Sequence, residues 1–323
     1  MVRKTLLFIA VFMSLFGVEV QAGHWPHWRG PFLNGSADEK NLPGTLSLAE
    51  NVMWTKTLPG HSSATPIICK GRVFVSSTDK ESNDLLGLCF DVTTGKELWR
   101  KKLGTATRTV RRNNMATPSP VTDESKVCFM YGTGELACLN YDGDIIWTRN
   151  IEADYGNIST NWGYSSSPLI YNGKLYILVQ RGASMFRREG QNSKGVELPE
   201  PFMLVIDPKT GKNIWKQPRK TDAIAEALDA YSTPIAFENN GRTEIVVIGL
   251  GNFSSQFFCV FTQVNRNRFD SLRPPAENKF SRSDQGIAKL AMCDNNNTEH
   301  KSSCKHKVGG FGPIGRRPLL MLC

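Results

Sequence analysis

The stretch Asp207-Pro-Lys-Thr-Gly-Lys-Asn-Ile-Trp215 decides the fold, because the chain repeats it. An earlier copy reads Asp91-Val-Thr-Thr-Gly-Lys-Glu-Leu-Trp99, and a looser, shorter copy reads Asn140-Tyr-Asp-Gly-Asp-Ile-Ile-Trp147. In each copy the opening side chain can accept hydrogen bonds from the backbone of its own turn. The central glycine can adopt the positive φ that a tight turn with a bulge requires. The pattern therefore predicts three β-hairpins, each with a tryptophan on its second strand.

A second pattern precedes these hairpins and begins with serine or threonine followed by proline. Its proline positions are 66, 120, 168 and 234, which are 54, 48 and 66 residues apart. Each unit predicts four short strands, and self-similarity at this length indicates a β-propeller. The positions that we assign to the repeat are Pro66, Asp91, Gly95, Trp99, Pro120, Trp147, Pro168, Asp207, Gly211, Trp215 and Pro234.

The recurrent tryptophans suit the space between neighbouring blades. A single four-stranded unit cannot bury both faces of its sheet, whereas stacked units can, and a large aromatic ring fills the gap between them. We therefore expect these tryptophans to be mostly buried between sheets. The alternative is that they stack on a ligand.

The predicted fold class is all-β, an incomplete β-propeller of four-stranded blades with three full blades and part of a fourth. The blades are expected at about residues 62–103, 115–151, 163–218 and 230–251, within a repeat domain that spans 23–251. The segment Asn51–Leu58 is expected to be an outer strand that completes the last blade. The repeat stops at Gly251, and residues 252–323, which show no sustained strand alternation, are expected to form an irregular, disordered basic tail.

The combined pattern S/T-P-x-x-x-x-G-x-hydrophobic followed by D-x-x-T-G-K-x-x-W resembles the pyrroloquinoline-quinone-like, or quinoprotein-type, propeller repeat. That superfamily includes quinoprotein dehydrogenases and the propeller lipoprotein of the outer-membrane barrel-assembly machine. The opening His24-Trp-Pro-His-Trp-Arg-Gly-Pro31 is similar to the start of an exported bacterial branch, so the resemblance covers residues 24–251. The turn motif is architectural and is shared by catalytic and non-catalytic members.

Catalysis in this superfamily, as the resemblance implies, uses a quinone on the ring axis, a calcium site with acidic and amide ligands, a catalytic aspartate and a stacking tryptophan. The calcium ligands do not map onto positions of this sequence. The vicinal cysteine pair of many such dehydrogenases is also absent from it. We therefore expect no cofactor, with pyrroloquinoline quinone and calcium belonging to the alternative, enzymatic interpretation.

Residues 1–22 have the features of a signal peptide. Arg3 and Lys4 give a basic start, Leu6–Val18 is a largely apolar run too short for a membrane span, and Val20-Gln-Ala22 offers small residues for cleavage. We expect export to the periplasm or the extracellular space and no transmembrane span after cleavage; an uncleaved anchor is the alternative. The cleavage site has no cysteine, so a lipoprotein anchor is not supported.

The formal net charge of +9 is distributed unevenly. Residues 252–323 contain eleven Lys or Arg against five Asp or Glu, which accounts for +6 of it. The repeat region is close to neutral, so the sequence does not indicate a nucleic-acid groove. A protein or another cell-envelope ligand is the expected partner.

Loops between the repeats supply the candidate recognition residues. Several polar and basic side chains between the first two repeats could bind an anionic group: Arg108, Arg111, Arg112 and Asn113. Aromatic residues between the second and third repeats suit a recognition surface: Tyr155, Trp162 and Tyr164. The alternatives are a solvated loop with local ion pairs and an ordinary loop anchored by its aromatic rings. A long insertion at 180–201 adds to the third repeat.

No standard metal spacing is present. Cys69, Cys89, Cys128 and Cys138 fall on strand positions where small apolar residues fit, and we expect buried thiols, although an exported protein can pair cysteines. His24 and His27 alternate with tryptophans and have no carboxylate or cysteine nearby in sequence, which favours an aromatic cluster over a metal site. The tail residues Cys293, His300, Cys304 and His306 do not have zinc-site spacing.

Three functional hypotheses follow from the sequence. The first is an exported, non-catalytic propeller that serves as a binding or assembly platform, and the sequence favours it. The second is a quinoprotein-type oxidoreductase that uses pyrroloquinoline quinone. The third is a truncated or frame-shifted product without function, suggested by the abrupt end of the repeat at Gly251.

Overall fold

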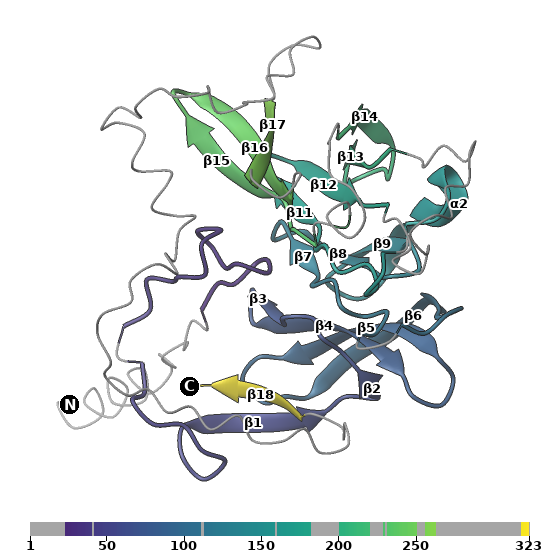
Figure 1. Cartoon of the computed structure of the whole chain (residues 1–323). Helices are drawn as coiled ribbons and strands as arrows, with labels where there is room; N and C mark the ends of the chain where they lie inside the picture. The colour runs from purple at the N-terminus through teal and green to yellow at the C-terminus, as the bar shows by residue number, and fades with distance from the viewer. Residues whose placement is uncertain are drawn as a thin grey trace, which may run out of the picture.

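The computed structural model describes residues 23–40, 42–110, 113–158, 160–181, 200–219, 229, 231–250, 256–262 and 318–322. Nearly all regular structure in these ranges is antiparallel β-sheet, arranged as small sheets that follow one another along the chain (Figure 1). The predicted fold class, an incomplete β-propeller of four-stranded blades, is confirmed.

The first blade contains five strands, two of which share the inner position. Strands β2 and β3 both pair with β4, β4 pairs with β5, and β5 pairs with the outer strand β6. Their bounds are β2 Gly60–His61, β3 Ile67–Cys69, β4 Arg72–Asp79, β5 Asp84–Asp91 and β6 Glu97–Thr105.

The second and third blades are regular four-stranded meanders in chain order. The strands of the second blade are β7 Val121–Thr122, β8 Lys126–Met130, β9 Glu135–Asn140 and β10 Ile145–Asn150, followed by the short helix α2 Ile151–Tyr155. The strands of the third blade are β11 Leu169–Tyr171, β12 Lys174–Val179, β13 Phe202–Ile206 and β14 Asn213–Pro218.

The fourth blade extends beyond the point where the repeat ends in the sequence. It contains β15 Ile235–Asn239, β16 Arg242–Leu250 and β17 Gln256–Thr262, and β17 pairs along β16 from Leu250 back to Glu244. The expectation that strands stop at Gly251 is therefore wrong for β17. The run Gln-Phe-Phe-Cys-Val-Phe-Thr is rich in strand-forming residues, but no D-x-x-T-G-K turn follows it to mark it as repeat sequence.

A further two-stranded sheet is formed by segments from opposite ends of the chain. Strand β1, Val52–Thr57, pairs antiparallel with β18, Pro318–Leu322, which is drawn in yellow beside β1 (Figure 1). The expected strand at Asn51–Leu58 is confirmed, but it pairs with β18 and does not join the fourth blade as expected. The expectation of an irregular tail is wrong for β18. Most of the remaining tail, including its cysteines and histidines, lies outside the described residues.

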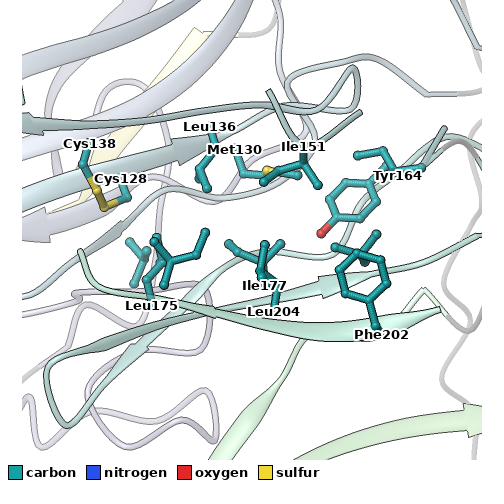
Figure 2. Packing of buried hydrophobic residues seen from close by; sticks show 14 residues of the cluster. Cys128, Met130, Leu136, Cys138, Ile151, Tyr164, Leu175, Ile177, Phe202 and Leu204 are labelled. Carbon is teal, nitrogen blue, oxygen red and sulfur yellow. A yellow bond between two sulfur atoms is a disulfide. The ribbon is translucent and has the colours of Figure 1, made fainter. Parts of the chain in front are cut away.

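The core lies between successive sheets. Along β8, Val127 and Phe129 face the first blade, whereas Cys128 and Met130 face the third, as the two-residue period of a strand requires. The cluster between the second and third blades includes Leu136, Ile177 and Leu204 (Figure 2). Each blade thus buries both faces only through its neighbours, as the repeat pattern predicted.

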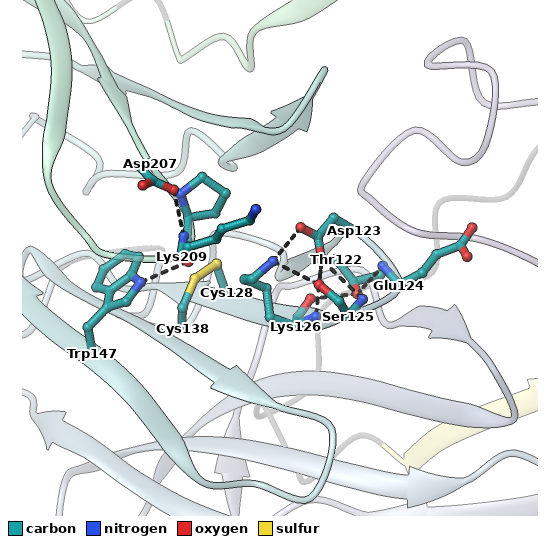
Figure 3. The surroundings of a disulfide bond; sticks show 11 residues. Thr122, Asp123, Glu124, Ser125, Lys126, Cys128, Cys138, Trp147, Asp207 and Lys209 are labelled. Atoms are coloured by element: carbon teal, nitrogen blue, oxygen red, sulfur yellow. Dashed lines mark hydrogen bonds and ion pairs between the residues drawn. A yellow bond between two sulfur atoms is a disulfide. The ribbon is translucent and has the colours of Figure 1, made fainter.

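The expectation of buried thiols is confirmed for Cys69 and Cys89, which are free and buried, but is wrong for the other pair. Cys128 and Cys138 lie directly opposite each other on β8 and β9 and form a disulfide (Figures 2 and 3). The sequence places both in one hairpin, but the register decides whether they meet, and a shift by one residue would place them on opposite faces.

Candidate functional site

The recurring contact of the repeat joins the tryptophan of one outer strand to the turn of the next blade. The Trp54 indole nitrogen donates to the Val92 carbonyl at 2.8 Å, and that of Trp99 donates to the Tyr141 carbonyl at 2.8 Å. The Trp147 indole likewise donates to the Pro208 carbonyl at 2.9 Å (Figure 3). We name these three contacts the tryptophan locks.

The locks explain the turn glycines more fully than turn geometry does. Gly95, Gly143 and Gly211 have positive φ, as expected. A Cβ atom at these positions would also lie 2.5, 2.8 and 2.8 Å from the indole rings of Trp54, Trp99 and Trp147. Glycine is therefore required for two reasons: the backbone has a positive φ, and the indole ring leaves no space for a Cβ. Trp99 is buried, and Trp147 and Trp215 are partly buried.

The aspartates of the repeat hold their own turns. One Asp91 carboxylate oxygen accepts hydrogen bonds from the Thr94 hydroxyl and backbone nitrogen, both at 2.7 Å. The first of these contacts is the main cause of a lowered Asp91 pKa. Asp207 accepts from the Lys209 backbone nitrogen at 2.9 Å, which lowers its pKa in the same way (Figure 3). These carboxylates have an architectural role.

The Ser/Thr-Pro elements also connect neighbouring blades. The Thr65 backbone nitrogen donates to the Ser119 hydroxyl at 2.9 Å, and the Ser119 backbone nitrogen donates to the Ser167 hydroxyl at 3.0 Å. The Ser167 backbone nitrogen in turn donates to the Thr233 hydroxyl at 3.1 Å. The sequence pattern identified the prolines at 66, 120, 168 and 234 but did not explain the hydroxyl residue before each of them. In the structure these residues form a continuous series of hydrogen bonds from one blade to the next, at the starts of the inner strands.

An aliphatic side chain occupies a β-bulge directly before each repeat tryptophan. The bulges fall at Leu98 on β6, Ile146 on β10 and Ile214 on β14, because the residues on either side pair with consecutive positions of the adjacent strand. These three side chains are 43, 44 and 45 % exposed. We name them the rim row, since they lie at the same position on the outer strands of successive blades.

The candidate Arg108 forms a local ion pair, which is the alternative interpretation from the sequence. Its guanidinium contacts both carboxylate oxygens of Glu152 at 2.7 Å and donates to the Gly132 carbonyl at 2.7 Å. The loop before the second blade is thereby fixed to helix α2. The neighbouring candidates Arg111 and Arg112 lie outside the described residues.

Two other candidates from different loops come together. The Asn113 amide donates to the Trp162 carbonyl at 2.9 Å, and the Trp162 backbone nitrogen donates to the Tyr231 hydroxyl at 3.2 Å. Tyr231 donates to Asp229 at 2.8 Å, and Asp229 also accepts from the Asn161 backbone nitrogen at 2.9 Å. Sequence reasoning missed the roles of Asp229 and Tyr231, because no motif marks residues that meet only across three loops.

Tyr164 and Tyr155 are packing residues of the core between the second and third blades. Tyr164 is 1 % exposed and donates to the Leu178 carbonyl at 2.8 Å, so its expected place on a recognition surface is wrong (Figure 2). The Tyr155 ring packs edge-on against Phe202 with centroids 5.1 Å apart. A loop whose aromatic ring is buried has the same sequence pattern as an exposed recognition loop, and only the packing in the structure distinguishes the two.

Comparison with known proteins identifies the repeat. A sequence model of the family described as outer membrane protein assembly factor BamB matches residues 49–196. The matched residues carry the PQQ-like propeller repeat. The matched segment begins before β1 and covers the first two blades of this PQQ-like array and part of the third. No curated protein matches the sequence.

Several solved structures are similar to the PQQ-like array. Quinohemoprotein alcohol dehydrogenase ADHIIG from Pseudomonas putida HK5 has 15% identity and a TM-score of 0.44, over 70% of this chain and 35% of that structure. Quinohemoprotein alcohol dehydrogenase from Comamonas testosteroni has 15% identity and a TM-score of 0.41, over 76% and 48%. BamB from Moraxella catarrhalis has 14% identity and a TM-score of 0.31, over 62% and 63%. The chain thus spans less than two thirds of each of these structures.

Within the described ranges, no helix has the length and apolar character that crossing a membrane would require.

Proposed function

We propose that this chain is an exported, non-catalytic propeller that serves as a binding or assembly platform for a protein of the cell envelope. The observation that carries the proposal is the rim row, in which Leu98, Ile146 and Ile214 expose aliphatic side chains at equivalent positions. The match to a family described as an assembly factor supports the same assignment.

The rim row has the properties of a protein-binding surface. Single exposed aliphatic residues are common on proteins. The three residues of the rim row differ in that they recur at the same position on the outer strands of successive blades, and this regularity supports the proposal. Each residue is the extra residue of a bulge, and bulges re-aim side chains. The locks of Trp99 and Trp147 fix the first three blades against one another, so the row has a set spacing. A pre-organised surface of this kind loses little entropy when it binds.

The acidic residues near the loops support a function without a quinone cofactor. Glu152 is held by Arg108, and Asp229 accepts from Asn161 and Tyr231. Glu135 accepts from the Thr133 hydroxyl and from the Asn150 amide. Because these carboxylates already accept the hydrogen bonds that fasten loops to blades, we propose that they do not serve as calcium ligands. We propose that the chain needs neither a quinone nor a calcium ion.

Export has support from two separate features. The Cys128–Cys138 disulfide belongs to the chemistry of oxidising compartments outside the cytosol. Residues 1–22 add a basic start, an apolar run and a small-residue cleavage site. N-terminal sequencing of exported material is expected to begin at Gly23, and intact Met1 in a soluble cytosolic pool would contradict export.

Site-specific photo-crosslinking in cells tests the platform. A photoreactive residue at position 98, 146 or 214 is expected to trap one and the same envelope protein, and Ile146→Asp is expected to abolish that product. Leu48 is the matched control because it is 78 % exposed but lies outside the rim row, so a photoreactive residue there is expected to give no such product. Equal products from all four positions would contradict the proposal.

A titration separates the platform from the oxidoreductase. Adding pyrroloquinoline quinone and calcium to the purified protein is expected to give no saturable change in absorbance. Stoichiometric quinone binding with turnover of an alcohol or a sugar would contradict the binding-platform hypothesis and support the oxidoreductase hypothesis.

A further inference from the structure

The segment His24–Gly35 lies along the inner strands of the blades, although it is distant in sequence from most of the residues that it contacts. Trp25 and Ile68 form a β-bridge, in which the Trp25 nitrogen donates to the Ile68 carbonyl at 2.8 Å and the Ile68 nitrogen donates back at 2.9 Å. This bridge occupies the edge of β3 that β4 leaves open. An open strand edge otherwise presents unpaired backbone groups to other chains.

The same segment reaches the second blade. The Thr122 backbone nitrogen on β7 donates to the Pro26 carbonyl at 3.0 Å. The His24 imidazole lies 3.7 Å from the carboxylate of Glu124 in the turn after β7. Glu124 is close to His24 only in space, so the sequence shows no carboxylate near that histidine. Two successive residues, Trp25 and Pro26, thus bond to the inner strands of two successive blades.

The segment then continues to the third and fourth blades. His27, Trp28, Arg29 and Leu33 line a small pocket, and its other wall contains residues from the start of both blades: Pro168, Leu169, Thr233 and Pro234. Leu33 also packs against the cluster between these blades. Residues 24–35 therefore hydrogen-bond to the inner strands of the first two blades and line a pocket together with the starts of the third and fourth blades.

Burial supports a fixed position for this segment. His27 is 8 % exposed, and burial, assisted by the nearby His24, lowers its pKa to about 4, so that the packed imidazole is neutral at pH 7. Gly30 has a φ of 71° and lies against the Trp25 ring, where a Cβ would be 2.7 Å from the nearest ring carbon. The Gly35 nitrogen donates to the Arg29 carbonyl at 2.8 Å and closes the loop.

We propose that residues 24–35 are an intramolecular strap, which binds the inner strand edges of the blades and sets their spacing. The strap is the occupant of these edges, so that β3 and β7 are closed to other chains while it is bound. Release of the strap exposes both edges and loosens the blades relative to one another. This inference is independent of any partner at the rim row, and its test needs no partner.

Hydrogen exchange measured by mass spectrometry on the full chain tests the strap. In Gly30→Ala, the amides of Ile68 and Thr122 are expected to exchange about tenfold faster or more, since the strap alone protects them. The amides that pair β4 with β5 are expected to keep their rates. Size-exclusion chromatography is expected to show self-association of this variant through the freed edges.

Gly241→Ala is the matched control. Gly241 lies outside the strap, in the turn between β15 and β16, and has a φ of 73°, so alanine there meets the same kind of backbone strain, but no atom lies within 4 Å of the new Cβ. Its exchange rates at Ile68 and Thr122 are expected to match the unmodified protein. Unchanged rates in Gly30→Ala, or equal acceleration in both variants, would overturn the strap.

A measurement on the unmodified protein covers the case in which Gly30→Ala fails to fold. Trypsin can cleave after Arg29, which is only partly exposed and lies within the strap. A bound strap is expected to resist this cleavage until the blades unfold. Rapid cleavage after Arg29 under native conditions, with the blades intact, would show that the segment is not bound and would refute the proposal.

Discussion

Replacing Gly211 with alanine tests the tryptophan lock between the second and third blades. Gly211 has a φ of 71°, and the Cβ of an alanine would lie 2.8 Å from the Trp147 ring. The ring cannot retreat without loss, because its indole nitrogen donates to the Pro208 carbonyl at 2.9 Å. The substitution therefore forces either the turn or the ring out of place.

The expected magnitude has two parts. An L-residue in the left-handed region costs about 1–2 kcal/mol. Overpacking against a fixed side chain adds about 1–3 kcal/mol. Gly173→Ala is the matched control, since Gly173 has a φ of 68° and no atom lies within 4 Å of its new Cβ. We expect Gly173→Ala to lose only the first part of the unfolding free energy and Gly211→Ala to lose both.

Urea unfolding followed by far-ultraviolet circular dichroism measures these losses without relying on tryptophan fluorescence. A double-mutant cycle with Trp147→Ala isolates the contact. Once the ring is removed, Gly211→Ala is expected to cost no more than Gly173→Ala, which gives a coupling energy of about 1–3 kcal/mol between the two positions. Equal losses for both glycines in the unmodified background, or a coupling near zero, would refute the lock.

Three further results are expected. The pKa of His27 is about 4 in the folded protein against 6.5 in the unfolded chain, so between these pH values the unfolded state binds one more proton. The free energy of unfolding should therefore fall by about 3 kcal/mol as the pH drops from 6.5 to 4. Urea titrations at several pH values should show this fall, and His27→Gln should flatten it. Reduction of the Cys128–Cys138 disulfide should lower the unfolding free energy by about 2–4 kcal/mol, and an unchanged urea midpoint in dithiothreitol would contradict it. Arg108→Met should cost about 1–3 kcal/mol because Glu152 loses a bidentate partner, whereas a neutral result would mean that this ion pair is solvated.

The candidate site was only partly accessible from sequence. Reasoning from composition found Asn113 and Trp162. The same composition also pointed to Arg108, which pairs with Glu152, and to Tyr164, which packing buries. It missed Asp229 and Tyr231, whose roles depend on contacts with a loop 68 or 69 residues away. The rim row was missed as well, because exposure of the residue before each tryptophan depends on a bulge in the strand pairing.

What the sequence determined by itself is the part of the fold encoded within a few neighbouring residues. The turn that starts at Asp91 and that which starts at Asp207 are closed by bonds to residues two or three positions away. Such contacts recur with the motif, so the hairpins, the four-stranded unit and the stacking of units follow from the repeat alone.

The tertiary structure alone decided which copies of the motif touch. Trp99 reaches a turn 42 residues ahead, Trp147 one 61 residues ahead, and Trp25 bonds to a strand in another unit. The register between β8 and β9 decided that Cys128 meets Cys138. The physical reason is common to these cases: turn chemistry acts on adjacent residues, whereas packing between blades depends on distances that no short motif records.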